Sequence, residues 1–252
     1  MKSTVKKLLL YIPTAALGLW CMSLQSRILV SGFDSKGLLI TGNPELKLLW
    51  GVTVVFLLTA LGLTRTLGGN GTYEENFSRC VLSGIVTIGA GCVMAFSGLN
   101  GLVPGAYLNG GLAIAAGVCM GVCGVCRLFG KKPLFVFDFA IGLYYACNLL
   151  SSYSGWNSDP QVQEYAFRLL AGVAAMLFSL HRARCAGGFQ DRKKLVFAGF
   201  AGIFLSFVAI PGSGSMGFFL ASGLWCAGAM CDLRYLEVPE KISGEDGEEP
   251  KQ

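Results

Sequence analysis

The stretch from Cys80 to Cys126 contains no Lys, Arg, Asp, Glu or His, and it constrains the fold more than any other part of the sequence. At 47 residues it is too long for a single crossing of a bilayer, whose hydrocarbon core takes about 20 helical residues. Of all 252 residues, 53% are apolar and 14% are charged. An ordinary soluble domain carries about 25% charged residues. The sequence therefore excludes a disordered chain and a water-soluble globule, and it predicts an all-α, polytopic membrane helix bundle.

Eight apolar stretches of the chain are long enough to form membrane-crossing helices. They cover residues 8–26, 46–64, 80–98, 109–126, 134–153, 165–183, 195–211 and 214–231. Two neighbouring pairs are divided at Pro104-Gly105 and at Pro211-Gly212, because proline and glycine favour turns. The first stretch follows three lysines and also fits a cleaved signal peptide, but Trp20 is a poor fit to the processing site. We expect a retained helix.

Lys and Arg are unevenly divided between the segments that join these helices. If the N-terminus lies in the cytoplasm, 16 of the 20 Lys and Arg residues fall on the cytoplasmic side. The exceptions are Arg27, Lys36, Lys47 and Arg168. Cytoplasmic loops of membrane proteins carry an excess of positive charge. The bias therefore predicts eight crossings with both termini in the cytoplasm, and it interprets Arg127, Arg182 and Arg192 as cytoplasmic charges that set this topology.

Parts of the two halves of the chain match when the sequence is shifted by 107 residues. The shift pairs Pro104-Gly105 with Pro211-Gly212, Gly110 with Gly217, Cys119 with Cys226 and Gly121 with Gly228. Asn43-Pro44 and Asp159-Pro160 also open helices in the two halves, each as a capping residue followed by proline. A duplication gives two four-helix halves, residues 1–126 and 127–231, arranged as a 4+4 parallel repeat. Chance matching is the alternative, because 35 residues are glycine.

The last segment, residues 232–252, is much more charged than the rest of the chain. Its part from 245 to 250 reads Glu-Asp-Gly-Glu-Glu-Pro, contains no aromatic side chain and buries too little apolar surface to fold. We interpret the segment as an acidic, disordered cytoplasmic tail. Docking of a partner subunit on the tail stays open, with no specific motif behind it, and membrane lipids are the expected partners of the helices.

Asp138 is the acidic residue that lies well inside a predicted helix. A carboxylate at the bilayer centre costs about 2.5–3.5 kcal/mol on insertion scales, so such residues usually face a partner or a cavity. At about 100° per residue, Tyr145, Asn148 and Ser152 share its side of the helix 134–153. This polar stripe predicts either a hydrogen-bonded contact between helices or a path for a substrate or a proton, and both interpretations stay open.

A second polar group surrounds the short loop between the helices 134–153 and 165–183. It contains Trp156, Asp159, Glu164 and Arg168. Glu164 and Arg168 are four residues apart, a spacing that permits an ion pair on a helix. Arg168 either extends to the membrane interface or contacts a ligand. If a polar solute enters from outside, we expect this loop to form its entrance, the outer mouth.

Three cysteines give a weaker candidate site. Cys119, Cys123 and Cys126 share one face of the helix 109–126, and the last two have the C-x-x-C spacing of a redox or metal site. Close helix packing is the favoured alternative. The small residues that would form the contact ridge are Ala113, Gly117 and Gly121.

Other chemistry has little support in the sequence. The single histidine, His181, cannot build a metal cluster or a Ser-His-Asp set. We find no phosphate-binding glycine loop and no nucleic-acid motif. We therefore expect no catalytic residues, no metal, no cofactor and no nucleic-acid partner.

One segment reads Trp156-Asn157-Ser158-Asp159-Pro160-Gln161-Val162-Gln163-Glu164-Tyr165 and continues through Phe167 to His181-Arg182. It resembles a segment of uncharacterised multi-pass membrane proteins of anaerobic Gram-positive bacteria. The similarity covers mainly the fifth and sixth predicted helices. That group has no established activity, so the resemblance implies a location in a bacterial inner (plasma) membrane and no mechanism.

Three functions stay open at this point. The duplication, the glycine-rich helices and the polar stripe favour a non-enzymatic small-solute transporter or permease-like protein. The first alternative is a non-catalytic membrane scaffold or sensor subunit that signals through its tail. A membrane enzyme that uses cytoplasmic thiols is the least favoured.

Overall fold

The structure, a computed structural model, describes residues 2–32, 43–67, 77–78, 80–102, 107–156, 162–189, 192–211 and 216–233. Its helices are α1 (Lys2–Ser31), α2 (Pro44–Leu67), α4 (Val81–Asn100), α5 (Tyr107–Leu128), α6 (Phe135–Trp156), α7 (Val162–Ala186), α8 (Arg192–Ala209) and α9 (Met216–Cys231). Each of the eight predicted helices is present. Within these ranges the one β-type contact is an isolated antiparallel bridge between Phe77 and Leu233. The all-α prediction is confirmed.

The start of α2 illustrates how the sequence sets a helix boundary. Asn43 accepts a hydrogen bond on its Oδ1 atom from the backbone N–H of Glu45, at 3.0 Å. Pro44 occupies the first helical position, where its missing N–H leaves no donor unsatisfied. The predicted capping signal at Asn43-Pro44 is confirmed, whereas Asp159-Pro160 lies outside the described residues.

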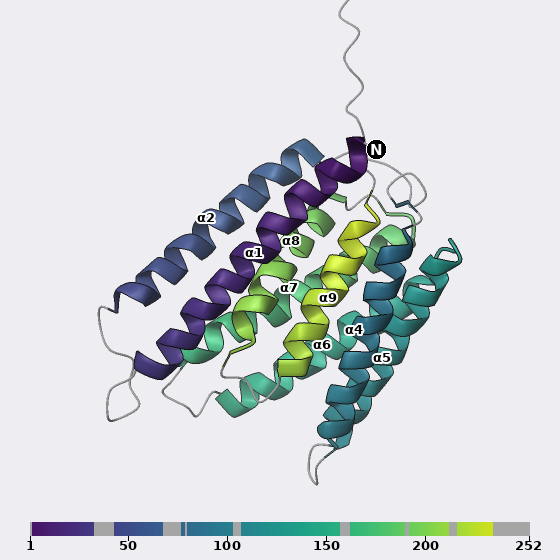
Figure 1. Cartoon of the computed structure of the whole chain (residues 1–252). Helices are drawn as coiled ribbons and strands as arrows, with labels where there is room; N and C mark the ends of the chain where they lie inside the picture. Colours follow the sequence, from purple (N-terminus) through teal and green to yellow (C-terminus); the bar gives the residue numbers. More distant parts are fainter. Residues whose placement is uncertain are drawn as a thin grey trace, which may run out of the picture.

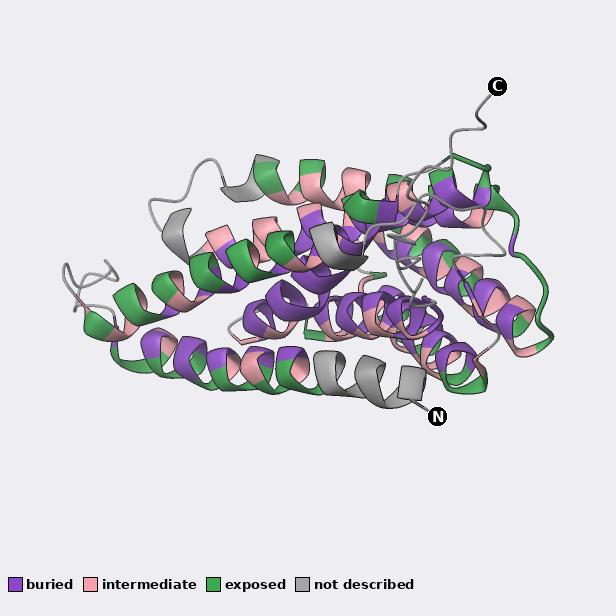
Figure 2. Cartoon of the chain, turned by 90° about the horizontal axis from the view of Figure 1, so that it is seen from above, coloured by how far each residue is buried: buried purple, intermediate pink, exposed green. Residues whose placement is uncertain are grey.

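Helix α8 lies at the centre of the bundle and is buried on nearly all sides. Of its 18 residues, 14 are buried. It contacts α1 and α2 on one side and α7 and α9 on the other (Figure 1). Seen from above, α8 and α9 form the buried middle of the molecule (Figure 2). The rings of Phe56 on α2 and Phe204 on α8 stack at 4.3 Å between centroids, which fixes α2 against this centre.

Helices α4 and α5 form the closest pair in the bundle. A Cβ atom added to Gly91 would lie 2.6 Å from the carbonyl oxygen of Gly117, and one added to Gly117 would lie equally close to the oxygen of Gly91. Only glycine permits this approach. The predicted small-residue ridge is correct at Gly117 but wrong at Gly121, where an added Cβ would meet nothing within 4 Å. The third close contact is made instead by Gly124, which packs against Gly84.

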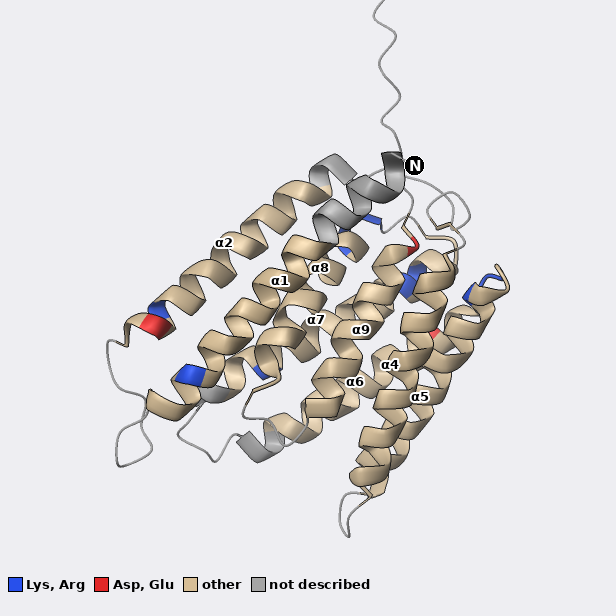
Figure 3. Cartoon of the chain, in the orientation of Figure 1, with Lys and Arg blue, Asp and Glu red and all other residues tan. Residues whose placement is uncertain are grey.

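The length and hydropathy of the helices fit a polytopic membrane protein. In the described part of the chain, five helices are long and apolar enough to cross a bilayer, namely α2, α4, α5, α6 and α7. Helix α9 is equally apolar in character but has only 16 residues. The coloured Lys, Arg, Asp and Glu residues gather toward the two ends of the bundle and leave a middle zone that is almost free of charge (Figure 3). The chain is an integral membrane helix bundle.

The 4+4 repeat and the domain boundaries stay predictions. Helix α9 of the expected second half packs against α4 of the first, and α1 packs against α8. Contacts of this kind occur both in a duplicated fold and in an unrepeated bundle. The number of crossings beyond the five long apolar helices and the sidedness of the termini also stay predictions.

Candidate functional site

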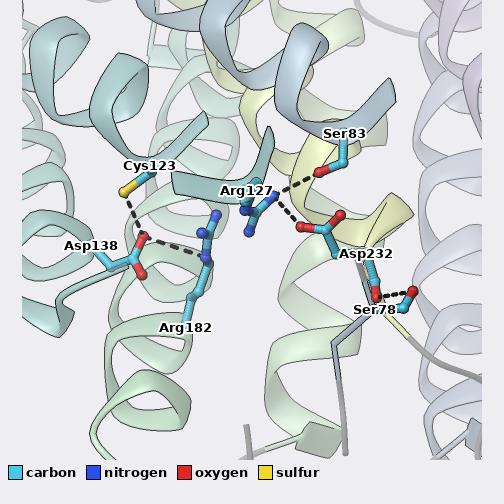
Figure 4. A network of polar contacts seen from close by, with 7 residues as sticks. All are labelled: Ser78, Ser83, Cys123, Arg127, Asp138, Arg182 and Asp232. Carbon is cyan, nitrogen blue, oxygen red and sulfur yellow. Dashed lines mark hydrogen bonds and ion pairs between the residues drawn. The ribbon is translucent and has the colours of Figure 1, made fainter. Parts of the chain in front are cut away.

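Two ion pairs are buried near the same end of the bundle, and Figure 4 shows them together. The first, which we call the inner pair, joins Asp138 in the first turn of α6 to Arg182 near the end of α7. The Nε atom of Arg182 lies 3.3 Å from Oδ1 of Asp138, and both side chains are 0% exposed. A single charge at such a position would be costly in a bilayer, so each side chain stabilises the other in its charged form.

Two further helices enclose the inner pair. The guanidinium carbon of Arg182 lies 4.4 Å from the ring centroid of Trp225 on α9, within the range of a cation–π contact. The indole N–H of Trp225 in turn donates to the hydroxyl of Ser179 at 3.1 Å. From α5, the thiol of Cys123 points to Oδ1 of Asp138 with an Sγ–Oδ1 distance of 3.8 Å. A thiol is a weak donor, and the second oxygen of Asp138, Oδ2, has no hydrogen-bond partner among the described residues.

The second ion pair, which we call the end pair, joins Arg127 to Asp232. Its N–O distance is 2.8 Å and both side chains are 4% exposed. Arg127 also donates to the hydroxyl of Ser83 on α4 at 2.9 Å. The backbone carbonyl of Asp232 accepts from the backbone N–H of Ser78 at 2.7 Å and from its hydroxyl at 3.2 Å. The end pair therefore ties together the start of α4, the end of α5, the end of α9 and the segment 77–78.

A third polar contact lies further along α6. The hydroxyl of Tyr145 donates to the hydroxyl of Ser222 on α9 at 2.9 Å, and Ser222 donates to the carbonyl oxygen of Phe218 at 2.7 Å. Both side chains are buried. Aromatic rings surround the contact, because Phe218 meets the edge of Tyr145 with 5.5 Å between the ring centroids.

The predicted polar stripe on α6 divides into two parts. Asp138 and Tyr145 are buried and contact α7 and α9 through side-chain polar atoms. Asn148 and Ser152 are half-buried. The alternative of a polar contact between helices therefore holds for Asp138 and Tyr145. The alternative of a path for a substrate or proton stays a prediction.

The predicted outer mouth falls largely outside the described residues. This applies to the whole of Asp159 and to the side chains of Trp156 and Glu164, so the expected ion pair between Glu164 and Arg168 stays a prediction. Arg168 itself is half-buried, and its guanidinium carbon lies 5.3 Å from the ring centroid of Tyr165.

Three arginines that the sequence places on the cytoplasmic side, Arg127, Arg182 and Arg192, are buried, at 4%, 0% and 4% exposed. Their sidedness stays a prediction. Helix α5 continues past its predicted end at 126 to Leu128, and α8 begins at Arg192 rather than at 195, whereas Arg182 lies in α7 within the predicted range 165–183. All three arginines therefore belong to helices and are buried in the bundle.

The cysteines show little sign of a redox or metal site. All ten lie in the described part of the chain and none forms a disulfide. Cys123 is buried beside Asp138, whereas Cys119 and Cys126 are half-buried. The described residues contain no group of three or more His, Cys, Asp or Glu side chains placed to hold a metal ion.

The arrangement resembles the charged centres by which membrane proteins bind or pass ions, in that a carboxylate and a guanidinium face each other inside the bundle. Asp138 is completely buried but only partly hydrogen-bonded. Comparison of the chain with protein-family models, with curated proteins and with solved structures finds no match.

Proposed function

We propose that the chain is a membrane transport protein for a small solute, and that the inner pair of Asp138 and Arg182 is the charged element on its transport path. The observation that carries the proposal is the incomplete hydrogen bonding of a fully buried carboxylate, Asp138. An ionisable residue inside a membrane bundle usually marks an ion, proton or substrate path. A buried ion pair adds little net stability over well-packed apolar residues, so the fold alone gives no reason for it.

The polar groups beyond the inner pair support the same proposal. Tyr145 with Ser222 and Trp225 with Ser179 place hydroxyl and indole groups between α6, α7 and α9. Asn148 and Ser152 continue the polar side of α6 toward its other end, near the proposed outer mouth. Together they supply polar atoms along the length of α6.

The experiment is a flux assay in proteoliposomes that contain the pH-sensitive dye pyranine. The vesicles are exposed in turn to amino acids, sugars, carboxylic acids and amines, with and without a pH gradient. We expect wild type to take up at least one class, read from the dye where a proton moves with the solute and from the retained radiolabelled solute where none does, and Asp138→Asn to lose that flux. Glu45→Gln is the matched control, because it makes the same acid-to-amide change at a half-buried helix start away from the pair. Equal flux in wild type and Asp138→Asn would remove Asp138 from the mechanism.

A double variant separates a functional pair from a structural one. Asp138→Asn with Arg182→Gln removes both charges and leaves no unbalanced charge in the bundle. If the pair only supports the fold, the double variant regains both stability and flux. We expect it to regain stability and to stay inactive in the flux assay.

The orientation is part of this proposal. We place the protein in a bacterial plasma membrane with both termini in the cytoplasm, on the basis of the Lys and Arg distribution. A cysteine introduced at Lys193, in a variant without the native cysteines, should be protected from a membrane-impermeant maleimide in intact cells and labelled after lysis. Labelling in intact cells would reverse the orientation.

The end pair favours a second candidate, a scaffold or sensor subunit. The bridge between Phe77 and Leu233 and the ion pair of Asp232 fix the point from which the acidic tail starts. A fixed origin suits a tail that docks a partner subunit. This function predicts that deletion of residues 234–252 abolishes co-purification of a partner, while Asp138→Asn leaves co-purification unchanged.

A further inference from the structure

A groove lies on the surface of the bundle between α2 and α1, two helices that do not contribute to the inner pair. Its volume is about 460 Å³, and it is open along one side. It is lined by Leu17 of α1 and by seven residues of α2, which are Lys47, Leu48, Gly51, Val52, Val55, Phe56 and Thr59. Gly51 opens the groove, because a Cβ added there would meet nothing within 4 Å. The volume falls in the range of ligand pockets, about 300–1,000 Å³.

The groove has the length of one leaflet of a bilayer. Its lining runs along α2 from Lys47 to Thr59, which is about 18 Å at the rise of an α-helix. Half of a hydrocarbon core about 30 Å thick is about 15 Å. Lys47 lies in the first turn of α2, at the end of the membrane-spanning segment that starts at Pro44. The groove therefore extends from the level of the lipid headgroups to near the middle of the membrane.

The chemistry of the lining changes along this length. From Leu48 to Phe56 the lining side chains are apolar, and the hydroxyl of Thr59 is already bonded to the carbonyl oxygens of Val55 and Phe56, at 3.0 and 2.7 Å. A polar solute would find no hydrogen bond there, whereas a hydrocarbon chain would fill the space. At the mouth stands the ammonium group of Lys47, while the acidic neighbour Glu45 does not line the groove.

A second cation lies at the same end. Arg27 is exposed near the C-terminal end of α1, and α1 and α2 are consecutive neighbouring helices, so the end of α1 meets the start of α2. The blue segments on the described parts of α1 and α2 lie toward the same end of the bundle (Figure 3). Two cations at headgroup level favour an anionic lipid over a zwitterionic one.

We infer that this groove is a binding site for one acyl chain of an anionic phospholipid, whose headgroup is held at Lys47. The site is independent of the proposed transport function. It retains a lipid at one defined position, in contrast to the exchanging lipids that surround any membrane protein.

The test is native mass spectrometry of the purified full chain, titrated with phosphatidylglycerol or with phosphatidylcholine of the same acyl chains. We expect wild type to retain one phosphatidylglycerol, with an affinity about fivefold above that for phosphatidylcholine, which is the preference typical of one basic residue near the surface. Lys47→Gln should reduce this preference, and Lys47→Gln combined with Arg27→Gln should remove it. Gly51→Leu should fill the groove and lose the retained lipid of either kind.

The matched control is Gly111→Leu on α5, an exposed position where an added Cβ also meets nothing within 4 Å. It should retain lipid as wild type does. Val55→Phe is a second filling variant at a position 62% exposed, for use if Gly51→Leu does not fold. The site would be overturned if both filling variants keep the lipid, or if wild type binds the two lipids equally and Lys47→Gln changes neither.

Discussion

The inner pair and the end pair have the same chemistry but different surroundings. In the end pair, Arg127 and Asp232 lie at helix ends, and both take part in hydrogen bonds that hold four segments of the chain together. In the inner pair, Asp138 and Arg182 lie within their helices, against an indole ring and a thiol. The fold accounts for the end pair as a clamp. The inner pair also lies between helices, but besides Arg182 its carboxylate has a thiol, a weak donor, where the end pair has hydroxyl and backbone hydrogen bonds, and this difference is our reason to assign a function to Asp138.

The two pairs should also differ in how much stability is lost when one member is removed. Removal of one member of a buried ion pair leaves a charge without compensation, and the penalty grows with distance from water. The inner pair is 0% exposed, and its partners lie about one turn inside their helices. The side chains of the end pair are 4% exposed and lie beside the bridge between Phe77 and Leu233. We therefore expect the two pairs to respond differently to the same substitution.

The largest effect should follow Asp138→Leu. The substitution removes the carboxylate that faces the guanidinium of Arg182 between the helices, and we expect a loss of about 3–5 kcal/mol in the free energy of unfolding. The measurement is an unfolding titration in mixed micelles of a mild detergent and SDS, followed by circular dichroism. A loss below about 1 kcal/mol, the range of surface ion pairs, would mean that water reaches the inner pair.

The second largest effect is the stability that a double variant should regain. Asp138→Leu combined with Arg182→Leu removes both charges, and we expect the free energy of unfolding to return to within about 1–2 kcal/mol of wild type. The double-mutant cycle then gives the coupling energy between the two side chains. If the double variant is as unstable as the sum of the single variants, Asp138 and Arg182 do not interact and the comparison of the two pairs fails.

Much of the fold could be predicted from the sequence, because long apolar runs specify helices in a membrane almost without competition. The ends of the helices could be predicted less well from the sequence. Helix α7 continues past its apolar run until Gly187-Gly188, and Gly188 has a φ of 95°, a conformation that favours glycine. Gly130, with a φ of 69°, follows α5 in the same way. These glycines, rather than the last apolar residue, indicate that the arginines before them belong to helices.

The candidate site could be predicted only in part, for a related reason. Asp138 was identified because a carboxylate inside an apolar helix needs a partner. Arg182 lies at the same predicted depth, at the inner end of the next predicted helix, but it was interpreted as a charge that sets the topology and not as a partner of Asp138. The partners of Arg127 could not be predicted, since Asp232 lies far along the chain and meets it only when α5, α9 and the segment 77–78 are assembled.

The third effect concerns the end pair. Asp232→Asn should lower the free energy of unfolding by about 1.5–3 kcal/mol, the range of hydrogen bonds to charged groups, because Arg127 keeps its bond to Ser83. Hydrogen exchange should increase at Ser78 and at the end of α9, while the flux assay should match wild type. A loss of flux with intact stability would show that the end pair also belongs to the transport path.

A smaller effect is expected for Ser83→Ala, which removes one acceptor of Arg127 and leaves its ion pair with Asp232 intact. We expect a loss of about 0.5–1.5 kcal/mol in the same unfolding titration. Ser97→Ala, at a half-buried position further along α4, is the control for the general effect of a serine-to-alanine change on this helix. If both variants lose the same stability, the bond from Arg127 to Ser83 contributes nothing specific to the clamp.

The smallest effect should follow Cys123→Ser, at the thiol beside Asp138. The hydroxyl keeps a donor in nearly the same position, so we expect the free energy of unfolding to change by no more than about 1 kcal/mol, with flux unchanged. Cys123→Ala combined with Cys126→Ala should likewise keep flux, because the charge of the inner pair remains. A protein that is folded but inactive after either change would place a thiol in the mechanism and favour the membrane thiol enzyme over the transporter. The inner pair would then serve to position Cys123, since Asp138 is its polar neighbour on α6.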